Sequence, residues 1–148
     1  MANPRWGVFL PPENSRKNEA VLNAGFESLR VASDAGVTMC FGTDLLGPLG
    51  VAETKEFLLR SRVLSPVSIL QSATINPARL LGQADKLGQI RRGFTADLLI
   101  LNKNPLDDIT VLDDPEQNLL AVIKDGHVQV SRWSKLSLDV HGPLPVIE

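Results

Sequence analysis

The chain has 148 residues, 43% hydrophobic and 22% charged, which is typical of a soluble globular domain large enough to bury a core. Its formal net charge of −2 and pI near 5.7 give no electrostatic reason to expect nucleic acid or an anionic membrane as a partner. The one cysteine, Cys40, excludes a disulfide within the chain. No apolar run approaches the ~18 residues that span a bilayer, and no secretory signal is visible, so a cytoplasmic protein is expected.

The first part of the chain predicts a helix followed by a strand. Residues 1–18 are rich in Pro, Asn and charge and are predicted to form a loop. Apolar residues then recur every three or four positions, which predicts a helix from about Ala20 to Asp34, with Gly36 as its stop. The apolar face of this helix consists of Leu22, Phe26, Leu29 and Ala32. The β-branched and apolar residues from Val37 to Thr43 predict a strand, as in an αβ unit of a parallel sheet.

Two short helices are predicted after a loop rich in Gly and Pro. Ser65 precedes a proline, a pattern typical of an N-cap followed by the first helical residue, and it predicts a helix of about Pro66–Ala73. Asn76 precedes a proline in the same way and predicts a second helix of about Pro77–Leu81, which Gly82 ends.

Beyond residue 83 the sequence predicts short strands. Leu98 to Leu101 is an aliphatic run. Asp125-Gly126 is a strong signal for a two-residue hairpin, and it is flanked by the candidate strands Ala121–Lys124 and His127–Val130. One helix–strand unit cannot bury both faces of a parallel strand, which needs neighbouring strands and covering helices. The chain is therefore predicted to pack against more protein than it contains.

A series of short strings between roughly residues 20 and 130 matches one known order and spacing. The strings are Ala35-Gly36-Val37 with Phe41-Gly42-Thr43-Asp44, Ser65-Pro66, Gln71 to Ala78, Leu81-Gly82, Leu87 to Ile90, Gly93, Ala96 to Leu101, Asn104-Pro105-Leu106, and Val122 to Gly126. Each string alone is weak, but together they resemble the C-terminal portion of a metal-dependent amidohydrolase. Within that superfamily the chain most resembles the imidazolonepropionase and prolidase-like branch.

This resemblance implies an α/β fold of a particular kind. The family has a (β/α)8 TIM barrel with its metal site at the C-terminal ends of the strands. The chain would supply the last helix–strand unit of an incomplete barrel in residues 1–83. Residues 84–135 would form the C-terminal strands of a small β-sandwich, and residues 136–148 a tail.

The resemblance also implies a reaction and a residue. It implies a metal-dependent hydrolase that acts on amide or cyclic amide C–N bonds of small molecules or dipeptide-like substrates. Asp44 matches the aspartate that ends the last barrel strand, where it would be a metal ligand and proton shuttle for a divalent metal, expected to be zinc. The family's His-x-His pair and other histidines would lie upstream. The two histidines present, His127 and His141, stand in no such pair.

The residues around Asp44 support this position independently. Alternate residues of a strand share a face. The large residues Val37, Met39, Phe41 and Thr43 form one face, which suits packing under helices. Thr38, Cys40, Gly42 and Asp44 form the other, which suits a crowded barrel interior with the carboxylate at its rim. The alternative is that Asp44 only caps a turn or a helix, because Gly-Thr-Asp is common after strands.

Other candidate residues have structural interpretations that we favour. Cys40 is expected to be a buried structural thiol, and both histidines to be solvated. Asp107-Asp108 and Asp113-Asp114 lack the spacing of a calcium loop and are expected to be solvated. Leu45 to Gly50 is expected at the substrate-side rim.

A second hypothesis remains open beside the enzyme. The chain could be a non-catalytic truncated remnant or an assembly module that needs a partner chain, because an open barrel segment exposes apolar surface. For either hypothesis we expect a homo-oligomer or packing against the missing barrel portion. The enzyme hypothesis adds a small-molecule amide substrate, and neither includes a nucleic acid or a membrane.

Overall fold

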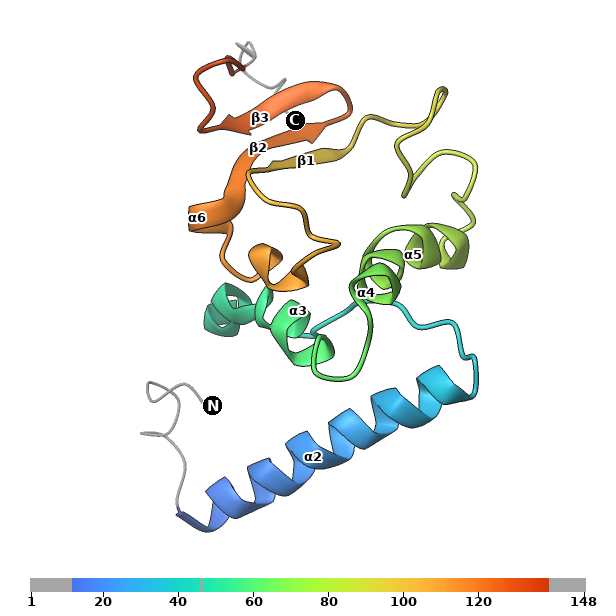
Figure 1. Ribbon diagram of the computed structural model, residues 1–148, viewed down its shortest axis with the longest axis vertical. Helices are drawn as coiled ribbons and strands as arrows, with labels where there is room; N and C mark the ends of the chain where they lie inside the picture. Colours follow the sequence, from blue (N-terminus) through green and yellow to red (C-terminus); the bar gives the residue numbers. More distant parts are fainter. Residues whose placement is uncertain (1–11, 46, 139–148) are drawn as a thin grey trace, which may run out of the picture.

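The computed structural model describes residues 12–45 and 47–138, and these form an α/β structure (Figure 1). The long helix α2 (Pro12–Asp34) lies along one side of the molecule, and a three-stranded sheet lies at the opposite side. Between them are the short helices α3 (Lys55–Arg60), α4 (Pro66–Ala73) and α5 (Ile75–Leu80).

Helix α2 is longer than its apolar pattern predicts. Residues 12–18 are helical, so the prediction of a loop was wrong for them. Proline has no N–H to donate, and the first turn of a helix has no acceptor for one, so Pro12 is a favourable first residue. The predicted end is confirmed: Gly36 has a φ of +68°, and the N–H of Val37 donates to the carbonyl oxygen of Ala32 at 2.9 Å.

The segment from Val37 to Thr43 does not form a strand, and this prediction was wrong. A strand is defined by hydrogen bonds to a neighbouring strand, and among the described residues none lies beside this segment. Its local sequence is typical of a strand, but the described part of the chain offers no neighbouring strand to pair with it.

Helix α4 has the predicted bounds and cap. The hydroxyl oxygen of Ser65 accepts a hydrogen bond from the N–H of Ser68 at 3.2 Å. Helix α5 begins at Ile75 with Thr74 at the cap position, so the prediction that Asn76 is the N-cap was wrong. Gly82, with a φ of +67°, follows the last turn of α5 as predicted.

The sheet consists of β1 (Leu98–Leu101), β2 (Leu119–Lys124) and β3 (His127–Ser131), antiparallel and in the order β1-β2-β3. The predicted hairpin joins β2 and β3: Asp125 and Gly126 have φ values of +51° and +82°, as a two-residue hairpin turn with both φ positive requires. Between β1 and β2 lie a 3-10 helix, η2 (Ile109–Leu112), and the one-turn helix α6 (Pro115–Asn118).

A small core connects the two halves of the chain. Its centre consists of Leu64, Ile69 and Ile109, which come from the α3–α4 connection, α4 and η2. Partly buried residues pack around it, namely Leu29, Met39, Phe57, Val63, Leu70 and Leu112. The segment before Asp44 therefore contacts the core through Met39. In the described part of the chain, no helix has the length and apolar character needed to cross a bilayer.

Candidate functional site

Asp44 lies where the extended segment ends, and its side chain is exposed. Its φ is +53°, and among the described residues only Asp125 shares a positive φ without being glycine. Aspartate tolerates this left-handed conformation better than most residues because its short side chain can bond locally. The backbone therefore turns at Asp44.

From Met39 onwards the two sides of this segment differ as the alternation predicts, except at Cys40. Met39, Phe41 and Thr43 are partly buried, and Met39 packs against the core. Gly42 and Asp44 are exposed on the other side. Two residues depart from the pattern, since Val37 is 56% exposed and Cys40 is partly buried.

Three hydrogen bonds hold the segment against the helices. The side-chain amide of Asn76 donates to the carbonyl oxygen of Met39 at 2.8 Å. The guanidinium Nη2 of Arg60 donates to the carbonyl oxygen of Cys40 at 3.0 Å. The N–H of Phe41 donates to the carbonyl oxygen of Ser72 at 2.8 Å. Helices α3, α4 and α5 thus hold the three residues 39–41, which lie three to five positions before Asp44.

Arg60 makes several contacts here, and it is not among the residues predicted from the sequence. The residue is 7% exposed, and its Nε donates to the carboxylate Oε1 of Glu56 at 2.6 Å. Its guanidinium carbon lies 5.2 Å from the centre of the Phe41 ring, within the range of a cation–π contact. The available signal was the spacing of Glu56 and Arg60, four residues apart in a short helix that is otherwise largely apolar.

The residues that the structure describes can supply one ligand of a metal site, but not a complete set of ligands. Within residues 12–45 and 47–138 no three His, Cys, Asp or Glu side chains come close enough to hold a metal ion. A zinc site normally needs three or four protein ligands, and the Asp44 carboxylate is a suitable oxygen donor for one of them. His127 begins β3 as an exposed residue, and His141 lies outside the described residues.

The structure also places the aspartates and the rim segment that were expected to be exposed or near the site. Asp108 caps η2, where its carboxylate accepts from the N–H of Thr110 at 2.9 Å. The prediction that Asp113 is solvated was wrong: its side chain is 10% exposed and pairs with Lys55 at 2.9 Å. Residues 47–50 of the expected rim (Leu45 to Gly50) belong to a 3-10 helix, η1 (Gly47–Ala52).

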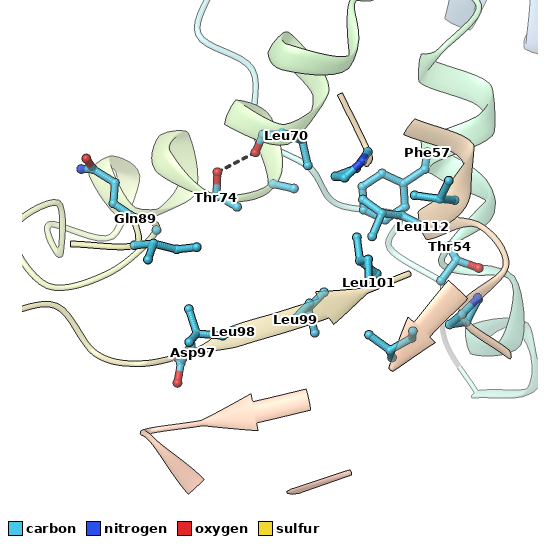
Figure 2. A pocket seen from close by; sticks show the side chains of 17 residues that line it. Thr54, Phe57, Leu70, Thr74, Gln89, Asp97, Leu98, Leu99, Leu101 and Leu112 are labelled. Atoms are coloured by element: carbon cyan, nitrogen blue, oxygen red, sulfur yellow. Dashed lines mark hydrogen bonds between the residues drawn. The ribbon is translucent and has the colours of Figure 1, made fainter. Parts of the chain in front are cut away.

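An apolar cavity of about 530 Å³ lies apart from Asp44, between β1 and the helices. In Figure 2 the side chain of Leu101 points toward Phe57 and Leu112 across the cavity, whereas Asp97 points away from it. Apolar side chains of β1, α3, α4 and η2 make up about half of the residues that line it. Asp44 is not among the lining residues, so this cavity is separate from the candidate site.

Asp97 fastens the β2–β3 hairpin from outside the strands. Its carboxylate accepts from the Nζ of Lys124 and, at 2.8 Å, from the N–H of Asp125. The hydrogen bond from Lys124, followed by that from the Asp125 backbone, lowers the pKa of Asp97 from its ordinary value. This group has a structural role in the turn.

Comparison with known proteins identifies the family to which the chain belongs. The model of the amidohydrolase family matches residues 7–128, so the chain belongs to the amidohydrolase family. Among characterised relatives, it is 32% identical to ochratoxinase of Aspergillus niger over 74% of this chain and 23% of that protein. It is 34% identical to imidazolonepropionase of Thermoplasma acidophilum over 62% of this chain and 23% of that protein.

Solved structures of amidohydrolases and prolidases also resemble this chain. An amidohydrolase superposes with a TM-score of 0.74 at 41% identity, covering 83% of this chain and 30% of that one. A prolidase complexed with N-methylphosphonate-L-proline superposes with a TM-score of 0.73 at 38% identity, covering 84% of this chain and 30% of that one. The chain thus spans about a quarter to a third of the length of these relatives.

Proposed function

We propose that the chain is the C-terminal part of a metal-dependent hydrolase of C–N bonds, with Asp44 as a metal ligand and proton shuttle. Membership of the amidohydrolase family supports hydrolysis as the type of reaction. In this proposal the extended segment before Asp44 is the last strand of a (β/α)8 barrel. The other strands and ligands come from protein outside residues 1–148.

The observation that carries the proposal is the contrast between the two sides of the segment that ends at Asp44. Met39 and Phe41 turn toward the core and α3, while Gly42 and Asp44 remain exposed. The backbone of residues 39–41 is already hydrogen-bonded to the helices. A carboxylate held at the end of such a segment, with its face uncovered, suits the rim of a barrel mouth.

The chemistry assigned to Asp44 is that of a general base and acid. A divalent metal, zinc in this proposal, would lower the pKa of a coordinated water toward ~7. The Asp44 carboxylate accepts a proton from the attacking water and then gives it to the leaving nitrogen. A carboxylate suits both steps because it exchanges a proton readily near neutral pH when its partner is activated.

We further propose that the substrate is a small amide or a cyclic amide. Two kinds of relative support this choice, a prolidase bound to an N-methylphosphonate derivative of L-proline and an imidazolonepropionase. A Xaa-Pro dipeptidase of known structure, 40% identical with a TM-score of 0.60, supports dipeptides as the first substrates to assay.

A chimera tests the proposal. The upstream portion of the prolidase that superposes with a TM-score of 0.73 is joined to this chain in place of its own matching region. Zinc-loaded chimera is expected to hydrolyse Xaa-Pro dipeptides, and Asp44→Asn is expected to lower kcat by about 10²–10⁴. Asp125→Asn is the matched control, because Asp125 is also exposed and has a positive φ. Equal kcat for Asp44→Asn and the control would show that Asp44 is not the proton shuttle.

The apolar cavity favours a second candidate function, that of an assembly module without catalysis. Leu99 on edge strand β1 is 57% exposed and lines this cavity of about 530 Å³, and Ile90 beside it is 90% exposed. Such apolar surface marks an interaction site. Sedimentation of the purified chain tests this candidate: a monomer that binds no partner barrel portion would count against it. Stoichiometric zinc with turnover by the chain alone would also exclude it.

A further inference from the structure

Arg60 connects helix α3 to the segment that carries Asp44. Its Nη2 donates to the carbonyl oxygen of Cys40 at 3.0 Å, and its guanidinium stacks on the ring of the next residue, Phe41, at 5.2 Å. Phe41 also packs against Phe57 of the same helix, with ring centres 4.5 Å apart. These contacts fix the backbone of two consecutive residues only three and four positions before Asp44.

The hydrogen bond to Cys40 has no substitute among the described contacts. In an extended chain, consecutive carbonyl groups point to opposite edges. The carbonyl of Met39 and the N–H of Phe41 are held by Asn76 and by Ser72, on α5 and α4. The carbonyl of Cys40 belongs to the other edge, where it accepts a hydrogen bond from Arg60.

Arg60 is itself held rigidly, which a positioning group requires. The Glu56 carboxylate accepts from its Nε at 2.6 Å, and the side chains of Arg60 and Glu56 are 8% and 15% exposed. Its Nη1 lies 3.5 Å from the hydroxyl of Ser72, which is 1% exposed. A guanidinium offers five donors in one plane, so it can bond a carboxylate and a carbonyl group at once.

We propose that Arg60 is a positioning residue for Asp44, acting through the backbone of Cys40 and Phe41. The inference rests on the proposed catalytic role of Asp44. Arg60 holds the edge of the segment that carries the Cys40 carbonyl, opposite the edge bonded to α4 and α5. The backbone that leads to the turn at Asp44 is therefore fixed on both edges. Without Arg60 the segment is held along one edge, and the carboxylate samples several positions.

NMR spectroscopy of the full chain tests this positioning without relying on activity. The double variant Glu56→Gln/Arg60→Met removes the tether without leaving a buried charge unpaired. In this variant the amide of Phe41 is expected to exchange with solvent about tenfold faster. The three-bond coupling of Asp44, which reports φ, is expected to move from its left-handed value to an averaged one. Arg60→Lys, which can still donate to Cys40, is expected to restore part of both signals.

The controls separate positioning from general stability. Arg62→Met removes an exposed arginine that stacks on Phe26 of α2 at 5.4 Å, and it should leave the Asp44 coupling unchanged. An unchanged Asp44 coupling in the folded double variant, or the same change in Arg62→Met, would overturn the proposal. In the unaltered chain, the guanidinium of Arg60 should show a through-hydrogen-bond coupling to the Cys40 carbonyl. Free rotation of that guanidinium would overturn the proposal without any variant.

A second readout is kinetic. In the chimera, Arg60→Lys is expected to lower kcat more than it changes KM, because misplacing Asp44 affects the reaction more than substrate binding. An altered Asp44 coupling in the double variant, together with an unchanged kcat in Asp44→Asn, would reject the proposed function alone. Loss of kcat in Asp44→Asn with unaltered kcat in both Arg60 variants would reject the positioning role alone.

Discussion

Gly88 lies so close to Thr74 that a Cβ on the glycine would be 2.5 Å from the Thr74 carbonyl oxygen. Gly88 also has a φ of +83°, which other L-residues rarely adopt. The loop after α5 therefore rests directly on the backbone where α4 meets α5. These two helices also supply Ser72 and Asn76 to the segment that ends at Asp44.

We predict that Gly88→Ala destabilises the protein strongly. The positive φ costs about 1 kcal/mol for alanine, and relief of the overlap adds about 1–3 kcal/mol. Gly93→Ala is the matched control, because Gly93 has a φ of +87° but open space where a Cβ would stand. Urea unfolding of both variants measures the difference. Equal losses of unfolding free energy would mean that the contact with Thr74 contributes nothing.

The buried pair Glu56–Arg60 predicts a non-additive pair of substitutions. Arg60→Met alone leaves the Glu56 carboxylate, whose Oε2 is buried, without its ionic partner. This variant is expected to lose about 3–5 kcal/mol of unfolding free energy. Glu56→Gln/Arg60→Met removes the charge as well and is expected to cost less than Arg60→Met. Chemical denaturation of the single and double variants gives the coupling free energy. Additive losses would contradict a direct interaction between these side chains.

Asp97 predicts a pH dependence of hairpin stability. Its hydrogen bonds with Lys124 and with the Asp125 N–H lower its folded-state pKa below the ordinary value of about 3.9. Such a group stabilises the folded state above its unfolded pKa, and this contribution is lost as the pH falls through the folded pKa. Asp97→Asn should therefore have a lower Tm than the wild type at pH 7. Between about pH 5 and pH 2 the Tm of this variant should fall by less than the Tm of the wild type.

The control for this titration is Asp107→Asn, since Asp107 is an exposed aspartate in the loop between β1 and η2. Thermal unfolding followed by circular dichroism at several pH values measures Tm for each variant. If Tm of Asp97→Asn depends on pH as Tm of the wild type does, the ion pair with Lys124 does not contribute to stability. The same conclusion follows if only Asp107→Asn weakens the dependence of Tm on pH.

The elements with local signals could be predicted from the sequence. The cap at Ser65 and the turn at Asp125-Gly126 depend on residues within a few positions, and both are present as predicted. The strand of residues 37–43 is predicted from its local sequence, but a strand also needs a hydrogen-bonded neighbour, and the described residues provide none beside this segment. The start of α2 at Pro12 was missed because proline suits a loop as well as a first helical residue.

The site could be predicted only in part, for a similar reason. Asp44 is a candidate because it matches a family motif and because of the alternation of the residues before it, and its role stays a prediction. Arg60 and Glu56 were not identified, because helical spacing alone does not distinguish a solvated pair from a buried one. The proline after Asn76 predicts that Asn76 is a cap, whereas its side chain donates to the carbonyl oxygen of Met39, 37 residues earlier.

The most direct test of the account is where a metal binds relative to Asp44. We propose crystallising the zinc-loaded chimera and measuring anomalous diffraction at the zinc edge. If Asp44 is a metal ligand, we expect a zinc peak at about 2.0–2.2 Å from one of its carboxylate oxygens, with the remaining ligands from the upstream portion. A fully occupied zinc site whose ligands do not include Asp44, with that side chain turned to solvent, would contradict it.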